Sequence, residues 1–276
     1  MSEIIEVSGD WLALREAEDA RARSRALAVA AAHELGPGPV AVHDLGSGTG
    51  SMMRWLAPML PGPQTWVLHD WNPDLTARAT DGAAPRDRDG RPVSITTRGG
   101  ELARLGPDDL DGASLVTASA LLDVLTSEEL HAVAAACIAV GRPVLLSLSV
   151  TGAVRLRPED PRDRAVEAAF NAHQRRIVNG RRLLGRYGAA IARGLFLQAG
   201  WNVRPADTLW RLDGRDPRLL REWFEGWVDA AAEQRPELEL ELSPAGGGYR
   251  ELRSAQLSRG GLAAIIVHTD LLAWPR

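Results

Sequence analysis

The sequence predicts an α/β protein of three layers, in which helices cover both faces of a mostly parallel central sheet. First, apolar runs such as VAVHDL (40–45) alternate along the chain with segments of helical periodicity. Second, these runs are largely apolar rather than alternating, which is typical of parallel strands buried on both faces. Third, a glycine-rich turn, GSGTG (46–50), connects the first such run to a helix-like segment.

The individual elements are expected in the following order. One or two amphipathic helices over 11–35 end at GPGP (36–39), which cannot continue a helix. Asn72 and Pro73 are well placed to cap and begin a helix, and Thr126 or Ser127 to cap another. The strands are expected at 40–45, 65–70, 93–97, 113–119, 142–150, 201–212 and 261–274, and the remaining helices at 51–60, 74–80, 126–140, 187–200, 216–239 and about 244–259.

Composition and charge narrow the class of protein. The chain has 276 residues, 45% of them hydrophobic, which is enough for a continuous core. Its formal net charge of −4 disfavours DNA as a partner, because duplex-binding proteins usually carry a basic surface. Cys137 is the single cysteine, so we expect no disulfide within the chain and no metal site. Because we find neither a membrane-length apolar run nor a signal peptide, we expect a cytoplasmic protein without a membrane partner.

The turn after the first expected strand requires bare backbone. Its pattern is Asp44-x-Gly46-x-Gly48-x-Gly50, and glycine lets the main chain approach a ligand closely while the next helix offers free N–H groups. Dinucleotide-binding proteins use G-x-G-x-x-G instead, but Ser51 stands where their third glycine would be. Asp44 would also repel a pyrophosphate. A purely structural turn is the other alternative.

The pattern D-x-G-x-G-x-G after an apolar strand resembles motif I of the class I S-adenosylmethionine-dependent methyltransferases. These proteins also carry an acidic residue at the end of the second strand, and Asp70 in TWVLHDWNP stands at that position. A carboxylate there can accept hydrogen bonds from both hydroxyls of a ribose. The resemblance covers residues 39–152 and implies a Rossmann-like methyltransferase fold with S-adenosyl-L-methionine as the cofactor.

The resemblance also implies which residues bind this cofactor. Trp71 stands where the family places an apolar residue against the adenine ring, and Glu101 replaces the more usual aspartate near the adenine amino group. Ser119 and Ala120 follow the fourth strand, whose end faces the transferred methyl group in this family. The full expected set is Asp44, Leu45, Gly46, Ser47, Gly48, Gly50, Asp70, Trp71, Asn72, Gly100, Glu101, Leu102, Ser119 and Ala120.

The acceptor is expected to bind to segments outside this core. The candidate catalytic residues are His173, Ser119 and Tyr187. The candidate acceptor-binding residues are Trp11, Arg15, Asn171, Arg175, Arg176 and His268. The many arginines of 153–186 favour a clamp for a carboxylate or phosphate, while a solvated helix face is an equally good interpretation, since the chain contains no lysine.

We expect one domain over residues 1–276. It would comprise an N-terminal helical lid (1–38), a cofactor-binding half (39–152), a helical insertion that forms the acceptor pocket (153–186) and the C-terminal half of the sheet (187–276). The preferred reaction is O-methylation of a small-molecule acceptor, with an anionic metabolite as one option. Methylation of RNA or another polyanion, and binding of the cofactor without turnover, remain alternatives, and a homodimer is left open.

Overall fold

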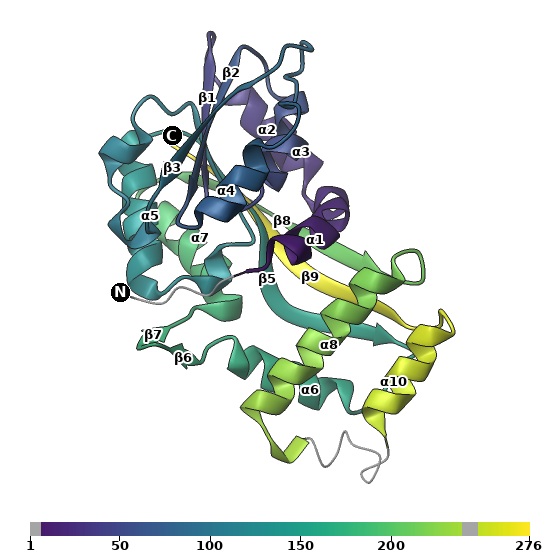
Figure 1. The fold of residues 1–276 in the computed structure, drawn as a ribbon. Helices are drawn as coiled ribbons and strands as arrows, with labels where there is room; N and C mark the ends of the chain where they lie inside the picture. The colour runs from purple at the N-terminus through teal and green to yellow at the C-terminus, as the bar shows by residue number, and fades with distance from the viewer. Residues whose placement is uncertain (1–6, 239–247) are drawn as a thin grey trace.

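The computed structural model describes residues 7–238 and 248–276, and within them the central sheet has seven strands in the order β3-β2-β1-β4-β5-β9-β8 (Figure 1). β1 to β5 pair in parallel, whereas β9 is antiparallel to both of its neighbours, β5 and β8. This confirms the prediction of a mostly parallel sheet. The strands are β1 (Val40–Leu45), β2 (Gln64–Asp70), β3 (Ser94–Gly99), β4 (Leu115–Ser119), β5 (Val144–Arg157), β8 (Asn202–Leu212) and β9 (Ala263–Trp274).

Helices cover both faces of this sheet, because successive strand side chains point to opposite sides. Leu45 and Val116 belong to the core formed with α5 and α7, whereas Val42 and Leu115 belong to the core formed with α2, α3 and α4. The three predicted layers are therefore present (Figure 1). The helices of these layers are α2 (Arg25–His33), α3 (Ser51–Leu56), α4 (Pro73–Thr80), α5 (Ser127–Val140) and α7 (Gly188–Gln198).

Three strands continue beyond these layers and carry a further core. The distal parts of β5, β8 and β9 pack against α6 (Asp163–His173), α8 (Pro217–Gln234) and α10 (Tyr249–Ser258), seen in the lower part of Figure 1. The fifth strand was expected over 142–150, and the register between β5 and β9 does shift directly after it, between Val150 and Val154. Gly152 has a φ of 82°, which lets the strand absorb the irregularity and continue to Arg157.

The expected helical insertion over 153–186 is thus only partly helical. After the end of β5 it contains α6, and then a short hairpin of β6 (Ile177–Val178) and β7 (Arg181–Arg182). The hairpin is joined to the start of α5 by a bridge between Thr126 and Leu183. Of the other expected segments, residues 1–6, 239 and 244–247 lie outside the described residues.

The N-terminal helix α1 (Gly9–Ala22) is attached to the edge strand β8 by hydrogen bonds to buried carboxylates. Nε1 of Trp210 donates to Oδ1 of Asp19 at 3.0 Å, and the backbone N–H of Arg211 donates to Oε1 of Glu18 at 2.7 Å. No helix within residues 7–238 and 248–276 has the length and apolar character needed to span a bilayer.

Candidate functional site

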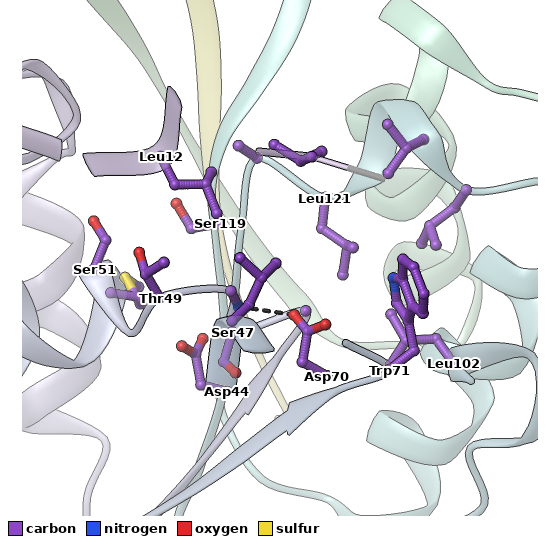
Figure 2. Close-up of a pocket in the computed structure, with 18 of the residues that line it drawn as sticks. Leu12, Asp44, Ser47, Thr49, Ser51, Asp70, Trp71, Leu102, Ser119 and Leu121 are labelled. Carbon is purple, nitrogen blue, oxygen red and sulfur yellow. Dashed lines mark hydrogen bonds between the residues drawn. The ribbon is translucent and has the colours of Figure 1, made fainter. Parts of the chain in front are cut away.

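A pocket lies at the carboxyl ends of β1, β2, β3 and β4 (Figure 2). Loops at these ends gather at one edge of a parallel sheet, which is where open α/β sheets usually bind ligands. The turn after β1 forms its floor, and α1 contributes Leu12 and Arg15 to its wall. We call it the glycine-turn pocket.

The turn after β1 is built from glycines for reasons that the structure makes explicit. Gly46, Gly48 and Gly50 have φ angles of 60°, 51° and 81°, a region that other residues rarely adopt. A Cβ atom on Gly46 would lie 2.7 Å from Cδ1 of Leu121, and one on Gly48 would lie 3.1 Å from Cδ1 of Leu12. Side chains at these positions would therefore fill the pocket as well as strain the backbone.

Asp70 fixes this turn from the end of β2. Its Oδ2 accepts a hydrogen bond from the backbone N–H of Gly48 at 2.8 Å, drawn in Figure 2, and its Oδ1 accepts one from Asn72 at 2.9 Å. Burial raises the pKa of Asp70, whereas these N–H groups lower it. Because each carboxylate oxygen has two lone pairs, both oxygens can still accept a hydrogen bond from a ligand.

Asp44 lies at the end of β1 and is 1% exposed. Its Oδ1 accepts a hydrogen bond from Oγ1 of Thr117 at 2.7 Å, while its Oδ2 has no partner among the described residues. Burial raises the pKa of Asp44 to about 7, although Thr117 and Arg23 act in the opposite direction. A cationic group in this pocket would therefore stabilise the ionised form of Asp44.

Arg23, which follows α1, brings a buried positive charge to the same pocket. Its Nη2 donates to Oγ of Ser119 and to Oγ of Ser51, each at 3.0 Å, and lies 4.0 Å from Oδ2 of Asp19. Nη1 of Arg23 is buried and, in the part of the chain that the structure describes, has no hydrogen-bond partner. The pocket thus offers both an unpaired carboxylate oxygen, on Asp44, and an unpaired guanidinium nitrogen.

Arg181 of the β6–β7 hairpin also lines the glycine-turn pocket. Its Nη2 donates to both carboxylate oxygens of Glu129, at 2.9 and 2.7 Å, and its side chain is 11% exposed. Glu129 is itself held at the start of α5, because it forms a capping box with Thr126. Nε and Nη1 of Arg181 are buried and lack a partner within residues 7–238 and 248–276.

The structure brings most of the residues expected to bind the cofactor to this pocket, and their roles remain predictions. Leu45 instead belongs to the core beneath the sheet. Gly50 shapes the turn without lining the pocket, and the side chain of Asn72 caps α4 by accepting a hydrogen bond from Asp74. The expected residues that line the pocket are Asp44, Gly46, Ser47, Gly48, Asp70, Trp71, Gly100, Glu101, Leu102, Ser119 and Ala120.

The residues expected to be catalytic or to bind the acceptor are more dispersed. Ser119 and Arg15 line the glycine-turn pocket, whereas Trp11 packs against Trp210, with ring centroids 6.5 Å apart. Four other candidates line a separate cleft on the insertion, namely Asn171, Arg175, Arg176 and Tyr187.

The two histidines expected to act in the site, His173 and His268, lie away from the glycine-turn pocket. Nε2 of His173 lies 3.1 Å from Oε2 of Glu233, joining α6 to α8, and His173 does not line the glycine-turn pocket. His268 is 3% exposed within β9, with its ring 5.6 Å from that of Trp210. Among the described residues, no histidine lines the pocket, and no group of His, Cys, Asp and Glu side chains could hold a metal ion.

The contacts of His268 lead to a prediction about stability. Burial, with Arg15 nearby, lowers the pKa of His268 to about 3, and its Nδ1 has no partner among the described residues. Below pH 6.5 the unfolded chain binds a proton at His268, whereas in the folded protein this histidine stays neutral. The free energy of unfolding is therefore fully retained above pH 6.5 and decreases as the pH falls below it. We expect the contribution of His268 to the free energy of unfolding to decrease by about 2 kcal/mol between pH 7 and pH 5.

His268→Phe should remove this pH-dependent part of the unfolding free energy, because phenylalanine packs in the same apolar surroundings and does not titrate. The measurement is urea unfolding of both proteins at pH 7 and pH 5. The comparison of the two proteins isolates His268 from the other titrating groups. An equal loss of unfolding free energy in both would contradict the assignment.

Sequence reasoning missed several residues that line the pocket. Arg23 reaches Ser119 across 96 positions of the sequence, so no local pattern connects them. Leu12, Ser51, Leu121 and Glu129 look like ordinary helix or loop residues in the sequence. A signal did exist for Arg181, since it belongs to the arginine-rich insertion, but Arg175 and Arg176 have the same signal and lie elsewhere.

Comparisons with known proteins find matches among solved structures. No family model matches the chain, and no curated protein matches it. Solved structures do match. The YcgJ protein from Bacillus subtilis is 12% identical with a TM-score of 0.48, over 91% of this chain and 98% of that one. A SAM-dependent methyltransferase from Geobacter sulfurreducens, in complex with S-adenosyl-L-homocysteine, is 16% identical with a TM-score of 0.41, over 99% and 100%.

A third similar structure is the cyclopropane synthase MmaA2 from Mycobacterium tuberculosis, 14% identical with a TM-score of 0.43, over 90% of this chain and 83% of that one. The sheet itself is mostly parallel, with the antiparallel β9 between β5 and β8, and helices cover both of its faces, as the fold class predicted from the sequence requires. The predicted fold class is therefore confirmed.

Proposed function

We propose that this protein is an S-adenosylmethionine-dependent methyltransferase. The observation that carries the proposal is the set of buried polar atoms in the glycine-turn pocket that have no partner among the described residues. These atoms are Oδ2 of Asp44, Oγ of Ser47, Oγ1 of Thr49 and Nη1 of Arg23. They combine acceptors with a cationic donor, which matches the ammonium and carboxylate of an amino acid.

The remaining walls suit the adenosyl part of such a ligand. The carboxylate of Asp70 has free lone pairs for the two ribose hydroxyls, and the bare glycine turn lets a ligand approach the backbone. Trp71 and Leu102 offer apolar side chains beside Asp70, as Figure 2 shows, and these would flank the adenine ring. The residues present therefore fit this cofactor.

When bound, the cofactor would supply an electrophilic methyl group to a nucleophile of the acceptor. The contribution of the chain is then to bind, align and exclude water. Leu12 and Leu121 stand over the glycine turn and would keep the reacting atoms dry. Asp44, half ionised near neutral pH, would carry a full negative charge beside the cationic cofactor.

The acceptor that we propose is a small anionic metabolite methylated on oxygen. The support is that Arg15 and Arg181 line the pocket together with Val124 and Leu125, and that two nitrogens of Arg181 have no partner within residues 7–238 and 248–276. A carboxylate or phenolate would arrive ionised and would need no histidine as a base. The pocket lining, which lacks histidine among the described residues, is consistent with such an acceptor.

The test has two stages. Calorimetric titration with S-adenosylhomocysteine should give micromolar binding, and titration with NAD should give none. Incubation with S-adenosylmethionine and a library of small acids and phenols should then yield methyl esters or ethers, detected by mass spectrometry. Binding of NAD instead would refute the proposal, and binding of S-adenosylhomocysteine without turnover of any acceptor would favour a protein that binds the cofactor without catalysis.

A further inference from the structure

A second cleft lies on the insertion, between α6, the β6–β7 hairpin and the start of α7. Four arginines and one tyrosine dominate its lining: Arg175, Arg176, Arg182, Arg186 and Tyr187. We call it the arginine cleft. It shares no lining residue with the glycine-turn pocket in the part of the chain that the structure describes.

The hairpin separates the two sites. Arg181 and Arg182 are successive residues of β7, and successive strand side chains point to opposite faces. Arg181 accordingly lines the glycine-turn pocket, whereas Arg182 lines the arginine cleft. The arginine cleft is therefore separate from the glycine-turn pocket, although the same hairpin contributes to both.

The arginine cleft carries positive charge that the protein does not neutralise. Among the described residues, none of its four arginines forms an ion pair with a carboxylate, in contrast to Arg181 with Glu129. Glu167 also lines the cleft, but its Oε2 accepts a hydrogen bond from the backbone of Val154 at 2.9 Å. Glu233 is paired with His173 at 3.1 Å. These carboxylates leave a clear excess of guanidinium groups.

Two of these guanidinium groups are held in place by the ring of Tyr187. Cζ of Arg175 lies 4.7 Å and Cζ of Arg186 lies 5.0 Å from its centroid, and Nη2 of Arg186 donates to the tyrosine hydroxyl at 2.9 Å. The backbone leaves room for both. A Cβ on Gly185 would lie 3.1 Å from Cγ of Arg175, and one on Gly152 would lie 3.0 Å from Cδ of Arg186.

Arg176 is also restrained, since its Nη1 lies 3.0 Å from Nδ1 of His173 and donates to the carbonyl oxygen of the same residue at 3.0 Å. Three of the four cations are thus ordered before any ligand binds, which lowers the entropic cost of binding. Planar guanidinium groups gathered in one cleft match the oxygens of a phosphate, which can accept paired hydrogen bonds from a guanidinium group.

We infer that the arginine cleft binds the phosphate group of a small phosphorylated ligand. Four cations suit the two negative charges of a phosphate better than the single charge of a carboxylate. A nucleic acid is disfavoured because proteins bind unpaired bases by stacking them on aromatic rings, and two guanidinium groups already contact the ring of Tyr187. The net charge of −4 argues in the same direction.

The experiment is calorimetric titration of the full chain with pyrophosphate. We expect sub-millimolar binding that Arg175→Gln combined with Arg182→Gln weakens by at least roughly 10-fold, with Arg182→Gln alone intermediate. The matched control is Arg193→Gln, which replaces an exposed arginine of α7 outside the cleft and should bind pyrophosphate as the wild type does. All variants should bind S-adenosylhomocysteine unchanged, so this result is independent of the proposed methyl transfer.

Three outcomes would overturn the inference. The wild type could fail to bind pyrophosphate at millimolar concentration, or the Arg193→Gln control could lose as much affinity as the double variant. An RNA oligonucleotide could also bind where pyrophosphate does not, with Arg175 and Arg182 required, which would assign the cleft to RNA. Thermal melting of each variant shows whether it is folded.

Discussion

Asp70→Asn is expected to weaken binding of S-adenosylhomocysteine by roughly 10- to 100-fold. Asparagine has one acceptor oxygen, whereas Asp70 accepts hydrogen bonds from both Gly48 and Asn72. The amide NH₂ of the variant would face one of these N–H groups, so the glycine turn would shift and the ribose would lose a charged acceptor. The affinity for 5′-methylthioadenosine, which keeps the ribose but lacks the amino acid part, should fall by a similar factor.

The matched control for this variant is Asp81→Asn. Asp81 is an exposed residue at the end of α4, and the change removes the same charge without touching the pocket. Both ligands should bind to it as to the wild type. Should Asp70→Asn bind S-adenosylhomocysteine normally while remaining folded, Asp70 would have no part in the site.

Arg23→Gln should separate the same two ligands. We expect the affinity for S-adenosylhomocysteine to fall by roughly 10- to 100-fold, since a charged hydrogen bond to the ligand carboxylate is lost. The affinity for 5′-methylthioadenosine should stay within about 2-fold of the wild type, because that ligand has no carboxylate. Calorimetric titration of both ligands gives the comparison directly.

Because Arg23 is 3% exposed and lies near Asp19 and Asp44, its replacement also leaves buried carboxylates less well compensated. Arg23→Lys keeps the charge but loses the planar fork, and should recover part of the affinity together with most of the stability. An equal loss of affinity for the two ligands in Arg23→Gln would show that the residue acts through the fold instead of through the ligand carboxylate.

Much of the fold can be predicted from the sequence, because the signals involved are local. Apolar strand runs, Asn72 as a helix cap and the capping box of Thr126 with Glu129 each depend on residues a few positions apart. The path of β5 is an exception. Gly152 looks like the end of a strand, yet pairing with β9, which is distant in the sequence, carries the strand past it.

The site divides in the same way. The turn of Gly46, Gly48 and Gly50 and the position of Asp70 follow from spacing along one βαβ unit, so the sequence brings them to one pocket. Arg23 and Arg181 reach that pocket from segments before and after the unit, and their approach depends on tertiary packing. Arg181 and Arg182 look alike in the sequence, and only their adjacent places in β7 of the hairpin bring Arg181 to one site and Arg182 to the other.

The attachment of α1 to β8 bears on how ligands enter and leave. Asp19 and Glu18, which accept hydrogen bonds from Trp210 and Arg211, are 5% and 4% exposed, and separating α1 from β8 would break two hydrogen bonds to carboxylates, each worth about 1.5 to 3 kcal/mol. We therefore expect α1 to stay against β8 as a wall of the pocket, and the role of residues 1–38 as a lid stays a prediction. Trp71 is the one aromatic side chain among the described residues that line the pocket, and it is 40% exposed, so we expect this side chain to limit how fast a ligand enters and leaves.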